Sequence, residues 1–114
     1  MSGVMAVDLQ VTFRGMNPSP SVEERVREKA AKMSHFYDRI LSSHAIVEAP
    51  DRHRSKGGVF RVTLHVAVPG KELVVNREPG DVEAHEDVMV AVRDAFDAMY
   101  RQLEDFARKL RAHG

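Results

Sequence analysis

The chain has 114 residues, a length that fits one domain with a single hydrophobic core. It contains no cysteine, which excludes disulfides and thiolate zinc sites and favours a cytosolic location. Its 17 basic and 17 acidic residues give a formal charge of zero, which argues against a general nucleic-acid-binding protein. The sequence has no run of about 18 apolar residues and no secretory leader pattern, so it predicts no membrane partner.

The first predicted elements are a strand over residues 7–14, where apolar and polar residues alternate, and a helix that ends near Asp38. Ser19, which precedes a proline, suits the N-cap of this helix, and Ser21 with Glu24 offers a competing capping box. The apolar stripe of the helix consists of Val22, Val26, Ala30, Met33 and Tyr37.

Three further strands are predicted, over residues 44–49, 59–68 and 73–75. The Pro69-Gly70 pair predicts a tight turn, so the last two strands should form a hairpin. The element order is therefore β-α-β-β-β-α, which is typical of an α+β single domain. Because polar and apolar residues alternate along the strands, we expect a four-stranded sheet with one face in water and two helices packed on the other.

Residues 87–110 contain neither glycine nor proline and predict one amphipathic helix, roughly 36 Å long at ~1.5 Å per residue. The preceding sequence Glu83-x-His85-Glu86-Asp87 looks like a set of metal ligands, but acidic residues before a helix favour its N-terminus, so we interpret them as a cap. The apolar stripe of this helix consists of Val88, Val92, Ala95, Phe96, Met99, Leu103, Phe106 and Leu110.

Charges are segregated along the chain despite their zero sum. Residues 51–61 carry four basic groups against one acidic group, whereas residues 71–87 carry six acidic groups against two basic ones. Such asymmetry can orient a protein on a polyanion, although two solvated loops of opposite sign give the same pattern.

The six histidines form no metal-ligand pattern, and only His44 and His65 can meet, across neighbouring strands. We therefore predict no metal and no cofactor. An enzyme that uses His44, His65 or Glu48 on the open face of the sheet is one alternative. The sequence offers no glycine-rich phosphate loop and no nucleophile elbow in support of it.

Two fragments at a suitable separation carry a resemblance to a known family. They are Lys29-x-x-Lys32-Met33 followed by Phe36-Tyr37-Asp38-Arg39-Ile40, and Asp87 with Ala91-Val92 and then Arg101-Gln102-Leu103. Together with the predicted topology, they resemble the hibernation promoting factor family, which includes the ribosome-associated translation inhibitor YfiA/RaiA. The resemblance extends from Val7 to Arg111.

The resemblance implies a non-enzymatic protein that binds the small ribosomal subunit and its ribosomal RNA, in the channel for messenger and transfer RNA. By motif, the implied phosphate contacts are Lys29, Lys32, Arg101 and Lys109. By proximity, Arg25, Arg108 and Arg111 are added. Structured RNA is recognised mainly through its shape and backbone, so a rigid basic ridge of two helices suits this role.

Each of these groups also has a purely structural explanation. Glu28 can pair with Lys32, and Asp97 stands four residues before Arg101 in the order that favours a helix ion pair. The same holds for Glu104 with Arg108 and Asp105 with Lys109. Likewise, the aromatic rings of Phe36, Tyr37 and Tyr100 can stack on bases but more often belong to the edge of a core.

The chain departs from the family pattern in three respects. It is neutral where short members are often basic, and it has Ala98 in a stretch where the family commonly carries a lysine. The basic loop residues Arg52, Arg54 and Lys56 can compensate for that loss. The chain ends at Gly114, so we expect no C-terminal domain and no unaided pairing of ribosomes.

The sequence thus predicts one ribosome-binding domain over residues 1–114, with residues 1–6 disordered. We expect it to repress translation in resting or stressed cells, to be monomeric off the ribosome, and to take no small-molecule substrate. The alternative is a protein-interaction module in which the acidic segment 78–87 binds a basic partner.

Overall fold

The computed structural model describes residues 8–49, 60–76 and 87–113. Within them the elements are β1 (Leu9–Arg14), α1 (Pro20–Ala31), the 3-10 helix η1 (Lys32–His35), β2 (Ser42–Glu48), β3 (Arg61–Val68), β4 (Lys71–Asn76) and α2 (Val88–His113). This order confirms the predicted β-α-β-β-β-α architecture. Residues 1–7, which include the segment expected to be disordered, lie outside the described part of the chain.

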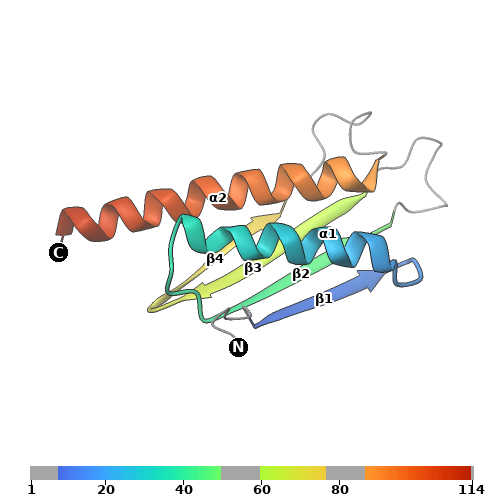
Figure 1. Ribbon diagram of the computed structural model, residues 1–114, viewed down its shortest axis with the longest axis horizontal. Coiled ribbons are helices and arrows are strands. Elements are labelled where there is room, and N and C mark those ends of the chain that lie inside the picture. The colour runs from blue at the N-terminus through green and yellow to red at the C-terminus, as the bar shows by residue number, and fades with distance from the viewer. Residues whose placement is uncertain (1–7, 50–59, 77–86, 114) are drawn as a thin grey trace.

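The four strands form one sheet in the order β1-β2-β3-β4. β1 and β2 are parallel, and their connection through α1 places this helix on the sheet, whereas the other neighbouring pairs are antiparallel. Both helices lie on the same face of the sheet, as predicted (Figure 1). The Pro69-Gly70 turn closes the β3–β4 hairpin, because Gly70 adopts the positive φ of 81° that a second turn position of this kind needs.

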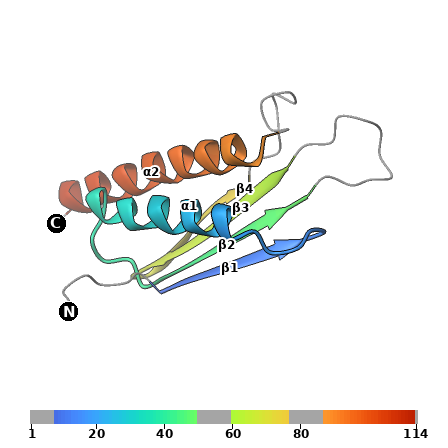
Figure 2. The same ribbon diagram turned by 45° about the vertical axis from the view of Figure 1, so that its right-hand side comes forward.

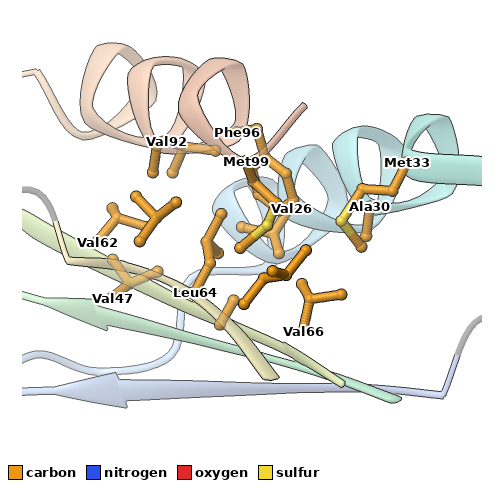
Figure 3. Close-up of a cluster of buried hydrophobic side chains, with 14 of the residues drawn as sticks. Val26, Ala30, Met33, Val47, Val62, Leu64, Val66, Val92, Phe96 and Met99 are labelled. Carbon is orange, nitrogen blue, oxygen red and sulfur yellow. The ribbon is translucent and has the colours of Figure 1, made fainter. Parts of the chain in front are cut away.

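The core is a single layer between the sheet and the two helices. Inward-facing residues alternate along β2 and β3 with residues on the open face, which is the burial pattern that the period-2 spacing predicts. Figure 3 shows Val26, Ala30 and Met33 of α1 and η1, Val92, Phe96 and Met99 of α2, and Val47, Val62, Leu64 and Val66 of the sheet meeting in this layer. All ten of these residues are at most 2% exposed.

Several element boundaries differ from the prediction by two or more residues, among them the end of α1, the start of β2 and the start of β4. α1 ends at Ala31 and tightens into η1 rather than continuing to Asp38, because Phe36 and Tyr37 turn toward α2 and pack on its aromatic rings. β2 begins two residues earlier than predicted, at Ser42. Serine has little preference for strands. However, the N–H of Ser43 donates a hydrogen bond to the carbonyl oxygen of Asp8 at 2.7 Å, which extends the pairing of β2 with the chain at the start of β1.

The end of the α2 stripe is a further difference. Leu110 was expected in the core but is 46% exposed. The last turns of α2 extend beyond the sheet, so no strand lies beneath them (Figures 1 and 2). At 26 residues and ~1.5 Å per residue, α2 is about 39 Å long, longer than the strands it crosses.

The structure decides between the two predicted caps of α1. Ser19 is the N-cap, and its hydroxyl oxygen accepts from the N–H of Val22 at 3.4 Å. Replacing Ser19 with alanine should lower the free energy of unfolding by about 1 kcal/mol, because it leaves an N–H at the helix start without its acceptor. Urea denaturation measures this change. Ser21→Ala is the matched control, since Ser21 lies inside the helix; an equal loss in both variants would contradict the assignment of the cap.

Candidate nucleic-acid interface

The two helices form a ridge on one side of the molecule. They lie side by side and run in the same direction, so their C-terminal halves are neighbours (Figures 1 and 2). Phe36 stacks on Tyr100 with ring centroids 4.8 Å apart, and Tyr37 meets Phe106 edge-on at 5.2 Å. These rings are therefore engaged within the protein, which confirms the interpretation of Phe36, Tyr37 and Tyr100 as residues at the edge of the core.

The basic stripe of α1 and η1 contains both paired and unpaired cations. Arg25 forms an ion pair with Glu28, with 3.2 Å between Nε and Oε1. Glu28 is thereby used by Arg25, and the alternative pair of Glu28 with Lys32 does not form. Within the described residues, the ammonium groups of Lys29 and Lys32 have no carboxylate at ion-pair distance.

The basic residues of α2 also include some that form ion pairs and some that form none with the described residues. Asp105 pairs with both Arg108 and Lys109, the latter at 3.7 Å, so Arg108 takes a partner three residues away rather than the expected Glu104. Arg101 does not pair with Asp97, and neither Arg101 nor Arg111 has a carboxylate partner in the described part of the chain. The predicted ion pair of Lys109 is confirmed, and that of Arg101 is wrong.

Four cations of the ridge thus remain without a protein partner among the described residues: Lys29, Lys32, Arg101 and Arg111. They lie in the C-terminal halves of the two helices or just beyond. Cations at that end of a helix are favoured by the partial negative charge of its last carbonyl groups. A cation with no internal carboxylate keeps its full charge for an external anion such as a phosphate.

The Arg101-Gln102-Leu103 motif places three successive side chains in three different environments. Leu103 is fully buried, and Arg101 is exposed on the outer side of α2. Gln102 reaches the edge of the sheet, where its Nε2 donates to the carbonyl oxygen of Val74 in β4 at 3.0 Å. Sequence reasoning missed this role of Gln102. The signal available was a glutamine beside a buried leucine, on the flank of a helix that crosses an edge strand.

Tyr100 joins the two helices. Its hydroxyl donates to the carbonyl oxygen of Lys29 at 2.7 Å. Burial, and secondarily the negative charge of Asp97, raises the pKa of Tyr100 to about 12. The phenol therefore keeps its proton near neutral pH and remains a donor. This contact was also missed, because the sequence does not show which side chain of α2 faces the end of α1.

The remaining basic candidates, Arg52, Arg54 and Lys56, lie outside the described residues. So does most of the acidic segment 78–87. Its last residue, Asp87, is described and caps α2, since its Oδ1 accepts from the N–H of Met89 at 2.9 Å. This confirms the predicted cap for Asp87.

A match to a protein-family model shows which family the chain belongs to. Residues 9–111 match the family described as sigma 54 modulation protein / S30EA ribosomal protein. The chain belongs to this family. The assignment confirms the resemblance read from the lysine pair of the first helix and the Arg101-Gln102-Leu103 motif of the second.

Solved structures support the S30EA fold. A ribosomal subunit interface protein from Coxiella burnetii has 20% sequence identity and a TM-score of 0.68, covering 90% of this chain and 99% of that one. The N-terminal domain of Protein Y from Thermus thermophilus has 22% identity and a TM-score of 0.60, with the same two coverages. The comparison with curated proteins returned no match.

The open face of this S30EA-family sheet carries the histidine pair. His44 and His65 stand opposite each other in β2 and β3, with ring centroids 6.4 Å apart, as predicted. His44 Nε2 lies 2.8 Å from the Thr12 hydroxyl, and Glu72 lies 3.6 Å from His65 Nδ1. Glu48 pairs in register with Arg61 near the other end of β2, so the three groups of the enzyme alternative do not converge.

Two further features are absent from the described residues. Among them, no group of three or more histidine, cysteine or acidic residues is arranged to hold a metal ion. In the same residues, no helix combines the length and the apolar character that crossing a membrane requires.

Proposed function

We propose that the protein binds the small ribosomal subunit through phosphates of its ribosomal RNA, and that it represses translation by occupying the channel for messenger and transfer RNA. The observation that carries this proposal is a set of four cations on the two adjacent helices, Lys29, Lys32, Arg101 and Arg111, which have no carboxylate partner among the described residues. The family assignment, and relatives described as a ribosomal subunit interface protein and Protein Y, support it.

The ridge suits a phosphate backbone for physical reasons. Two helices packed on a sheet through a buried core keep their surface rigid, so little ordering is needed on binding. Basic side chains on such a surface neutralise phosphates and release their counterions, which favours binding without reading the base sequence. Because the net charge is zero, attraction of the whole protein to RNA is weak, and binding depends on these local cations.

Repression by this mechanism involves no chemical step. A rigid domain with principal dimensions of 50 × 33 × 19 Å excludes other molecules from the space it occupies. We propose that the protein acts as a monomer in the cytoplasm of resting or stressed cells, where idle ribosomes are available. The effect should then scale with the occupied fraction of ribosomes.

Co-sedimentation tests this proposal. The purified protein should sediment with small ribosomal subunits and not with large ones, because the proposed site lies on the small subunit alone. Excess messenger RNA with a bound initiator transfer RNA should displace it, and added protein should slow cell-free translation in proportion to occupancy. Equal binding to both subunits, or binding that survives the competitors, would contradict the proposed site. Binding to a basic protein instead of ribosomes would favour a role for the acidic segment 78–87.

A further inference from the structure

One hydrogen bond joins the end of α1 to α2, from the hydroxyl of Tyr100 to the carbonyl oxygen of Lys29. α1 changes from α-helix to 3-10 helix between Ala31 and Lys32, and carbonyl groups at such an end lose their usual helical partners. The Lys29 carbonyl accepts from the backbone N–H of Lys32 and, at 2.7 Å, from the hydroxyl of Tyr100. The carbonyl group that Tyr100 binds therefore belongs to Lys29 and is also hydrogen-bonded to the backbone of Lys32.

Aromatic contacts hold the two helices together near Tyr100. Phe36 and Tyr100 stack with an interplanar angle of 18°, and Phe96 lies 6.2 Å from the Tyr100 ring. Stacked rings prefer an offset arrangement, but a contact between ring faces is less directional than a hydrogen bond. A hydrogen bond is directional, so the Tyr100 hydroxyl constrains where the last turn of α1 lies along α2.

The other side of α2 is held as well. Gln102 donates to Val74 at the sheet edge, and Leu103 is buried in the core. Tyr100 and Gln102 therefore anchor α2 on its two flanks, toward α1 and toward β4. Arg101 lies between these anchors and is turned to solvent. The position of the Arg101 side chain relative to Lys29 and Lys32 therefore depends on the hydrogen bonds of both Tyr100 and Gln102.

We propose that Tyr100 is a positioning residue, which aligns Lys29 and Lys32 with Arg101 so that the three cations meet RNA phosphates as one preorganised set. This inference rests on the proposed function. Preorganisation increases affinity by removing ordering that binding would otherwise require. Tyr100 itself need not touch RNA, since its hydroxyl is already bonded and its ring is packed against Phe36.

Tyr100→Phe tests this role, because it removes the hydroxyl and keeps the ring. We expect affinity for small subunits, measured for fully folded protein, to fall roughly three- to tenfold, about the effect of losing one hydrogen bond. Tyr37→Phe is the matched control. The hydroxyl of Tyr37 forms no hydrogen bond within the described part of the chain, so its loss should leave affinity unchanged.

A double-mutant cycle separates positioning from general stability. In a Lys29→Gln/Lys32→Gln background, adding Tyr100→Phe should cause no further loss of affinity, because the groups it positions are gone. An undiminished loss in that background would overturn the inference, and so would a Tyr100→Phe protein that melts earlier but binds as tightly as the parent. If the parent itself fails to bind subunits, the proposed function fails as well, which is a distinct result.

Discussion

Replacing Lys29 and Lys32 together with glutamine should weaken binding to the small ribosomal subunit at least tenfold, on the order of two lost phosphate contacts. The reason is that both cations lack a carboxylate partner among the described residues and so have their full charge available. Thermal stability should hardly change, since exposed charges on a helix contribute only a few tenths of a kcal/mol, about the size of the measurement error.

The salt dependence of binding gives a sharper measurement of the same change. With about four phosphate contacts, raising salt from about 50 to about 200 mM should reduce the parent's affinity on the order of a hundredfold. With two contacts removed, the same step should reduce affinity only about tenfold, because each phosphate contact contributes roughly one power of salt concentration. A slope that is the same in parent and variant would show that Lys29 and Lys32 do not contact phosphates.

Arg27→Gln with Arg93→Gln is the matched control. These two arginines also lie on α1 and α2, but they pair with Glu23 at 2.9 Å and Asp94 at 3.1 Å. Their removal changes the net charge by the same amount without removing an unpaired cation of the ridge. The control therefore separates the effect of local cations from that of total charge, and it should bind close to the parent.

The charge pattern shows what sequence spacing can and cannot predict. Helical periodicity determines which residues share a face, and on that basis spacing predicts Lys29 and Lys32 on one flank of a continuous helix. In the structure Lys29 lies in α1, and Lys32 is the first residue of η1. Spacing did not predict which cations are free. Glu28 is three residues from Arg25 and four from Lys32, so spacing allows either pair. In the structure Glu28 pairs with Arg25, and Lys32 stands at the start of the 3-10 helix.

The fold was predictable for a different reason. Each strand and helix has a clear apolar face, and burial of these faces outweighs local details, so the order of elements followed from periodicity. The contacts of Tyr100 and Gln102 were not predictable, because each depends on how α2 lies relative to a carbonyl group far away in sequence, in Lys29 and in Val74. A polar side chain on the flank of a helix has no periodic signature for such a partner.

Replacing Leu103 with alanine should lower the free energy of unfolding by about 2–5 kcal/mol, and replacing Phe96 by about 3–5 kcal/mol. Both side chains are at most 1% exposed, in the layer between α2 and the sheet, and close packing there leaves a cavity when either is truncated. For a domain that is stable by about 5–15 kcal/mol, each loss is a large fraction of the total. Urea denaturation with a fixed m-value measures it.

Leu110→Ala is the control that tests the placement of α2. Periodicity assigns Leu110 to the same stripe as Leu103, yet Leu110 is 46% exposed where α2 runs past the sheet. If burial against the sheet determines the effect, Leu110→Ala should cost well under about 1 kcal/mol, because half of its surface is in water in the folded protein and little cavity forms. Equal losses for Leu103→Ala and Leu110→Ala would mean that the end of α2 packs on something beneath it.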